Sequence, residues 1–155
     1  MKYSALIFDE GLQSEKSLQN LDELSQILKE DPNCRQIVVS CNQDEILHLA
    51  KTPISKAMYV AQLNEKYASL LNALKAVVEE NVLIFGLSSK VDESSVKHVL
   101  DALKEIPAVS LHENLRGFDT RLLMFALQKA MVEELRMTDY LDAINEYADF
   151  PCKSL

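Results

Sequence analysis

The chain has 155 residues, of which 24 are acidic and 16 basic, so its formal net charge is −8 at pH 7 with histidine neutral. The length predicts one domain over residues 1–155, and 48% hydrophobic residues supply a core and exclude disorder for the bulk of the chain. The acidic balance disfavours nucleic acid or an anionic membrane as partner, because phosphate binding requires a clustered positive surface.

The first half of the chain is predicted to form a strand, a helix, a strand, a short helix and a strand, over residues 2–8, 18–29, 36–40, 45–50 and 57–61. Apolar residues at helical spacing indicate the first helix, and β-branched residues indicate the second strand. Asn42 and Glu45 have the spacing of a capping box, in which each side chain satisfies a backbone N–H of the other, so the short helix should follow them.

The second half is predicted to form a helix, a strand, a helix, a strand and two helices, over or including residues 67–78, 82–85, 96–103, 108–111, 123–131 and 139–147. Asp92, Asp119 or Thr120, and Thr138 are the expected caps of the last three helices. The strand at 82–85 has no polar alternation, which is typical of a central strand covered on both faces.

Five strands that alternate with helices predict a three-layer α/β/α sandwich with a mainly parallel sheet. Ligands of such folds bind beyond the carboxyl ends of the strands. The segments in which we expect a site are therefore residues 9–17, 40–43, 61–65 and 85–90.

Features that several common sites require are missing from the sequence. The cysteines are odd in number, at Cys34, Cys41 and Cys152, and no C-x-x-C pair occurs, while the three histidines form no zinc motif. No metal ligand set is therefore predicted, and Cys152, near the end of the chain, is expected to be an exposed free thiol. The beginning of the chain lacks the pattern of a signal peptide, and the longest apolar run is far shorter than the ~20 residues that span a bilayer, so we expect a cytoplasmic protein.

Two segments near the first strand suggest chemistry and also allow ordinary structural interpretations. The run that ends in Asp9 resembles the nucleophile strand of haloacid-dehalogenase phosphatases, although Gly11 stands where that family has a second aspartate. Residues 11–17, with Lys16, resemble a P-loop without its second glycine, and Glu15 opposes phosphate binding. The structural alternatives are a solvated Asp9 and a turn in which Ser17 starts the helix.

A longer resemblance concerns residues 66–74 and the strand that follows. Lys-Tyr-Ala-Ser-Leu-Leu-Asn-Ala-Leu is similar to the R-x-x-S-V-x-N-G-L helix of the sugar-phosphate cytidylyltransferases, which include the methylerythritol-phosphate and ribitol-phosphate enzymes. Ser69, Asn72 and Leu74 match, and Lys66 keeps the charge of the arginine. Gly117-Phe118 resembles the Q-T-P-Q-x-F turn of that family, and Thr138-Asp139 resembles the start of its T-D-D-A-S segment. The resemblance implies a nucleotidyltransferase-like sandwich that binds CTP at the strand ends, with Ser69 on the nucleotide.

The departures from that family fall on its phosphate and metal groups. Its A-A-G-x-G-x-R loop is matched here only by Gly11, and Glu15 reverses the charge of the arginine. Its H-D-A-x-R-P segment, whose aspartate organises Mg²⁺, is replaced by residues 85–90 with Gly86 at the aspartate position. The chain is also shorter than typical members. No catalytic residue is assigned, and the candidate nucleotide-binding residues are Gly11, Lys16, Lys66, Ser69 and Asn72.

The leading hypothesis is therefore a degenerate, truncated cytidylyltransferase-like pseudoenzyme with weak or absent catalysis, which binds a nucleotide or a sugar phosphate or serves a protein partner as a regulatory module. One alternative is an active enzyme that uses Mg²⁺ and CTP, in which a sugar phosphate attacks the α-phosphorus and releases pyrophosphate, with Lys16, Lys66 and Ser69 seating the nucleotide. A further alternative is an aspartyl-phosphate phosphatase, or a flavodoxin- or receiver-like domain, that uses Asp9. The sequence predicts no oligomeric state.

Overall fold

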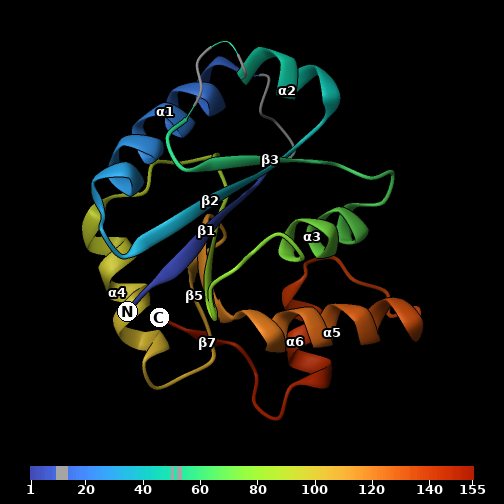
Figure 1. Ribbon diagram of the computed structural model, residues 1–155. Helices are drawn as coiled ribbons and strands as arrows, with labels where there is room; N and C mark the ends of the chain where they lie inside the picture. The colour runs from blue at the N-terminus through green and yellow to red at the C-terminus, as the bar shows by residue number, and fades with distance from the viewer. Residues whose placement is uncertain (10–13, 50, 52–53) are drawn as a thin grey trace.

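The computed structural model describes residues 1–9, 14–49, 51 and 54–155, and it places helices on both faces of a sheet (Figure 1). The strands in these residues are β1 (Tyr3–Phe8), β2 (Cys34–Cys41), β3 (Ala57–Ala61), β4 (Asn81–Phe85), β5 (Ala108–His112), β6 (Leu115–Asp119) and β7 (Lys153–Ser154). The helices are α1 (Glu15–Glu30), α2 (Gln43–Leu49), α3 (Lys66–Leu74), α4 (Glu93–Leu103), α5 (Thr120–Val132) and α6 (Leu141–Tyr147). Among the described residues, no helix is long and apolar enough to cross a lipid bilayer.

The strand order in the sheet is β3-β2-β1-β4-β6-β5-β7. The pairs β1–β2, β2–β3, β1–β4 and β5–β7 are parallel, whereas β6 is antiparallel to both β4 and β5. The predicted α/β/α sandwich with a mainly parallel sheet is confirmed. The flavodoxin- or receiver-like alternative is wrong, because those domains have the order 2-1-3-4-5.

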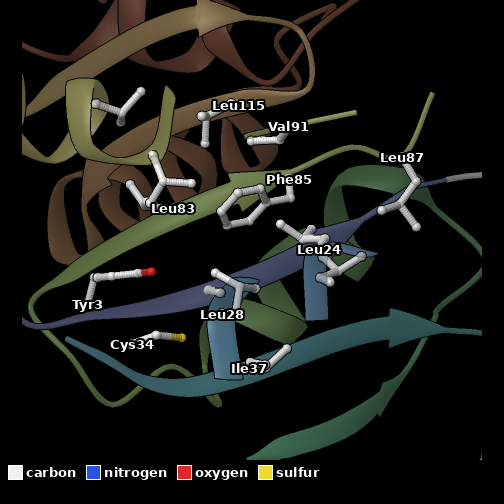
Figure 2. Close-up of a cluster of buried hydrophobic side chains, with 14 of the residues drawn as sticks. Tyr3, Leu24, Leu28, Cys34, Ile37, Leu83, Phe85, Leu87, Val91 and Leu115 are labelled. Atoms are coloured by element: carbon white, nitrogen blue, oxygen red, sulfur yellow. The ribbon is translucent and has the colours of Figure 1, made fainter. Parts of the chain in front are cut away.

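Two apolar clusters bury the faces of the sheet. The first lies under α1 and α4 and contains Tyr3, Phe85 and Leu115, as Figure 2 shows. The second lies under α3, α5 and α6 on the opposite face and contains Leu6 and Phe118. Successive residues of β1 and β4 point to opposite clusters, which explains why neither strand shows polar alternation in the sequence.

Local capping follows the sequence closely. The Asn42 side chain accepts the Glu45 N–H at 2.9 Å, and the Glu45 carboxylate accepts the Asn42 N–H at 2.8 Å, so the predicted capping box is confirmed. Asp92 accepts the Ser95 N–H at 2.8 Å and Asp119 accepts the Leu122 N–H at 3.0 Å, as expected for helix caps.

Four elements differ from the prediction, and one of them is the short strand β7, which the sequence analysis did not predict. Helix α3 ends at Leu74 rather than at 78, because the buried Gln36 side chain donates to the Ala76 carbonyl and accepts the Val78 N–H. Thr138 does not cap the last helix, since Asp142 reaches back to the N–H groups of residues 138 and 139.

The remaining difference is strand β6, which the sequence analysis also missed. Gly117 and Phe118 lie inside this strand and not in the turn that the resemblance suggested. A Cβ on Gly117 would lie 2.7 Å from side-chain atoms of both Val99 and Leu103. Glycine at this position therefore lets α4 pack directly on β6.

Candidate functional site

A cleft of about 460 Å³ lies at the carboxyl ends of the parallel strands, where ligands of open α/β sheets bind. Its walls come from the end of β1, the start of α3, the β4–α4 loop, the β5–β6 turn and the segment before α6. Strand β6 is antiparallel to β4 and β5, so its N-terminal residues lie at the edge of the sheet where the parallel strands end. The described lining residues are Phe8, Asp9, Lys66, Gly86, Ser88, Glu113, Asn114, Arg116, Thr138, Asp139 and Tyr140.

Asn114 fills the part of the cleft next to Gly86. Its amide oxygen lies 2.5 Å from the position that a Cβ of Gly86 would take, and its carbonyl oxygen accepts the Gly86 N–H at 3.1 Å. The same amide oxygen accepts the Ser88 hydroxyl at 2.9 Å, and the amide nitrogen donates to the Ser89 hydroxyl at 2.9 Å. Asn114 is only 6% exposed, so its hydrogen bonds fix the β5–β6 turn against the β4–α4 loop.

Asp9 supports that loop from the other side. Its Oδ2 accepts the Leu87 N–H at 2.6 Å, and the Leu87 carbonyl accepts the side-chain N–H of buried Asn20 at 2.8 Å. One oxygen of the Asp9 carboxylate is therefore engaged with the backbone. Asp9 therefore has a structural role, whereas the sequence analysis considered it only as a solvated residue or as a candidate for phosphoryl chemistry.

Arg116 is a buried cation at the wall of the cleft, with 8% of its surface exposed. Its Nε donates to the Ser110 hydroxyl at 3.2 Å, and its Nη1 donates to Asp139 Oδ1 at 2.9 Å. Its guanidinium carbon lies 5.1 Å from the centre of the Tyr140 ring, within cation–π distance. Burial alone would lower the pKa of Arg116, but Tyr140 and Asp139 more than offset this and raise the pKa, so the guanidinium stays charged.

Asp139 is held from two directions. Besides the Arg116 guanidinium, its Oδ1 accepts the Leu141 N–H at 3.0 Å, and its own N–H donates to Asp142 at 3.2 Å. Sequence reasoning singled out Thr138-Asp139 only through the resemblance and missed Arg116 altogether. The available signal was an arginine within the otherwise apolar run Leu-Arg-Gly-Phe.

The predicted nucleotide-binding residues are only partly brought together. Lys66 lines the cleft at the start of α3, whereas Lys16 is exposed on α1 and is not among the described lining residues. Ser69 is 2% exposed; its hydroxyl accepts the Leu63 N–H at 2.7 Å and lies 3.1 Å from the Leu63 carbonyl oxygen. Asn72 reaches the Ala61 carbonyl at 3.5 Å. Ser69 and Asn72 thus hold the loop that leads into α3, and Gly11 lies outside the described residues.

The residues present do not fit the magnesium site that the resemblance implies. The resemblance aligns Gly86 with the metal-organising aspartate, and the Asn114 amide oxygen lies only 2.5 Å from the position that a Cβ would take there. Within the described part of the chain, no group of three or more histidine, cysteine or acidic side chains could hold a metal ion.

No protein-family model and no curated protein sequence matches the chain. Solved structures do match it. The chain superposes on 4-diphosphocytidyl-2C-methyl-D-erythritol synthase from Anaerococcus prevotii with a TM-score of 0.79 and 18% identity, over 99% of this chain and 88% of that one. It superposes on 2-C-methyl-D-erythritol 4-phosphate cytidylyltransferase from Thermus thermophilus with a TM-score of 0.77 and 18% identity, over 100% and 88% of the two chains.

A looser match is the mannosyltransferase PcManGT from Pyrobaculum calidifontis, with a TM-score of 0.62 and 16% identity over 79% of this chain and 45% of that one. At these identities the likeness concerns the fold. The chain therefore has the nucleotidyltransferase-like α/β fold of the 2-C-methyl-D-erythritol 4-phosphate cytidylyltransferases.

Proposed function

We propose that residues 1–155 form a single degenerate cytidylyltransferase-like domain that binds a nucleotide-related ligand in the cleft without transferring a nucleotidyl group. The fold supports the ligand class, because the neighbours named above are cytidylyltransferases. The cleft volume of about 460 Å³ suits a small molecule. Lys66 would meet the ligand directly, Ser69 and Asn72 would support its loop, and Gly11 and Lys16 remain candidates from the sequence.

The packing of Asn114 against Gly86 is the observation that carries this proposal. Nucleotidyl transfer concentrates negative charge on the attacked phosphorus and on the leaving pyrophosphate, and enzymes offset that charge with metal ions and clustered cations. Here a neutral amide lies 2.5 Å from where the Cβ of any side chain at position 86 would be, and it is hydrogen-bonded to Ser88 and Ser89. We infer that the cleft has been rebuilt for binding.

The test separates turnover from binding. Purified protein is incubated with CTP, MgCl₂ and either methylerythritol 4-phosphate or ribitol 5-phosphate, and pyrophosphate release is measured beside the Thermus thermophilus enzyme as positive control. We expect release at the level of a blank without protein. Magnesium-dependent release well above the blank would instead establish the active-enzyme alternative.

Binding is measured in parallel by thermal shift with cytidine, CMP and CTP. A ligand at 100 times its dissociation constant adds about 2.7 kcal/mol to the free energy of unfolding. For a domain of this size, this raises the melting temperature by several degrees. Stabilisation by at least one of the three compounds, unchanged when Mg²⁺ is removed, is the expected result. No shift with any of them at millimolar concentration would refute the binding role.

A further inference from the structure

An ion pair between Arg116 and Asp139 lies in the wall of the cleft. Arg116 is the most buried cation that lines it, and a guanidinium in such a place is the natural partner of a phosphate. Asp139 already occupies that position, with its Oδ1 2.9 Å from Nη1. The Asp139 carboxylate thus occupies the position on Arg116 at which a phosphate of a ligand would bind.

Displacing this carboxylate is unfavourable because Asp139 is anchored independently of Arg116. The Leu141 N–H donates to the same oxygen, and the Asp139 backbone N–H is tied to Asp142. The side chain therefore cannot rotate away from Arg116 without also breaking the Leu141 N–H hydrogen bond at the start of α6. A phosphate that approached Arg116 would also lie next to the negative charge of the Asp139 carboxylate.

The other charged residues of the cleft do not supply the positive charge that a phosphate would need. Among the described lining residues, Asp9, Glu113 and Asp139 carry negative charge, while Lys66 and Arg116 carry positive charge, which leaves an excess of one negative charge. A triphosphate would bring up to four more negative charges into this cleft. The neutral residues Ser88 and Thr138 line the same space; their hydroxyls donate to Asn114 and Asp142, and each oxygen can still accept a hydrogen bond.

We propose that Asp139 is a specificity-determining residue that makes the cleft a site for uncharged nucleosides and excludes nucleoside triphosphates. This inference rests on the proposed function, since it concerns the ligand of the same cleft. Each added phosphate weakens binding, because it meets the paired Arg116 and the excess negative charge. The preferred ligand is therefore the part of a nucleotide that carries no phosphate.

The experiment compares the dissociation constants of cytidine, CMP and CTP by isothermal titration, without Mg²⁺, for the natural protein and for Asp139→Asn. Asparagine can still accept the Leu141 N–H, so the variant removes charge with little change of shape. The natural protein is expected to bind cytidine at least about tenfold more tightly than CTP, and the variant to reduce that ratio by about tenfold. Asp101→Asn, on the exposed outer surface of α4, gives the same change in net charge and should leave the ratio unchanged.

Raising the salt concentration provides a measurement that needs no variant. Added salt screens the repulsion between CTP and the cleft. The ratio of the CTP dissociation constant to the cytidine dissociation constant should therefore fall as the ionic strength rises. If cytidine binds but the ratio of the two dissociation constants is the same in Asp139→Asn as in the natural protein, or does not change with salt, the inference is overturned. The proposed function would remain valid in that case. Absence of binding by all three ligands to both proteins would refute the proposed function and the inference with it.

Discussion

Asn114 connects two loops of the cleft through one short side chain. Its amide contacts Ser88 and Ser89 in the β4–α4 loop, while its backbone accepts the Gly86 N–H. All of these hydrogen bonds are buried or half-buried, where an unsatisfied polar group is costly. The absence of a side chain at Gly86 is therefore part of the network, since any Cβ there would push the amide away.

Replacing Gly86 by alanine tests this directly. The new Cβ would lie 2.5 Å from the Asn114 amide oxygen, so the amide must shift and weaken its bonds to the serines. We expect a loss of about 1–3 kcal/mol in the free energy of unfolding, measured by urea denaturation. In an Asn114→Ala background the same substitution should cost about 1 kcal/mol less. Strictly additive effects in this double-mutant cycle would contradict the proposed contact.

The Asp142 carboxylate makes the stability of the folded protein depend on pH in the acidic range. Its Oδ2 accepts the N–H groups of Thr138 and Asp139 at 2.9 and 3.2 Å, and the Thr138 backbone hydrogen bond is the main cause that lowers the Asp142 pKa below its ordinary value of 3.8. A carboxyl group whose pKa is depressed by folding stabilises the folded state above its unfolded pKa, and this contribution disappears as pH falls through the folded pKa.

Asp142→Asn should therefore destabilise the protein near neutral pH, by no more than about 1 kcal/mol because solvent screens this partly exposed group. The difference from the natural protein should shrink as the pH is lowered from about 5 to below 3. Thermal denaturation at a series of pH values measures it, with Asp101→Asn as a surface control. A difference that stays constant over this range would show that the carboxylate charge is not involved.

At the scale of elements, the boundaries that the sequence predicted well are those set by neighbours in the chain. The Asn42–Glu45 box and the Asp92 and Asp119 caps each involve residues only three positions apart, so their spacing alone reveals them. The end of α3 depends instead on Gln36, which lies about forty residues earlier and reaches it only in the folded sheet. No local pattern carries that information.

Strand β6 was missed for a related reason. Its five residues include Gly117 and Asp119, neither of which favours a strand, and they run directly into helix α5. Its stability comes from pairing with β4 and β5 on both sides. Because Arg116 belongs to this strand, missing the strand also meant missing the main buried cation of the candidate site.

Gly117→Ala measures how closely β6 and α4 are packed. The added methyl group would lie 2.7 Å from side-chain carbons of Val99 and Leu103 and 3.0 Å from one of Leu83. All three neighbours are fully buried or nearly so, so the core can relax only in part. We expect a destabilisation of about 1–3 kcal/mol by chemical denaturation. In a Leu103→Ala background, which removes one of the clashing side chains, Gly117→Ala should cost less free energy of unfolding than it does in the natural protein. An equal cost in both backgrounds would argue against a steric cause.

Across the whole molecule, both faces of the sheet are covered, and this burial affects all three thiols. Cys34 and Cys41 face the cluster under α1 and α4, and Cys152 is half-buried against the other cluster. Burial is the first cause that raises each pKa, to about 11 for Cys41 and for Cys152. The expectation from sequence of an exposed Cys152 is therefore wrong.

Thiol titration with a disulfide reagent at pH 8 checks this arrangement, since only the thiolate reacts. In the folded protein each cysteine should react at least about tenfold more slowly than in the same protein unfolded in denaturant. Cys152→Ser isolates the contribution of the most accessible thiol. Rapid reaction of Cys152 in the native protein would mean that the segment after α6 does not pack as described.

Strand β6 also has a consequence for how this fold can diversify. It brings a hairpin tip, at residues 113 and 114, to the rim where the parallel strands terminate. In a hairpin the turn type and the loop length fix the register of the two strands, and Asn114 in this tip is buried and hydrogen-bonded to Ser88 and Ser89. A change in the length of this one tip would therefore alter both the pairing that positions Arg116 and the contacts of the β4–α4 loop, so this rim of the molecule can vary only if both sides of the cleft change together.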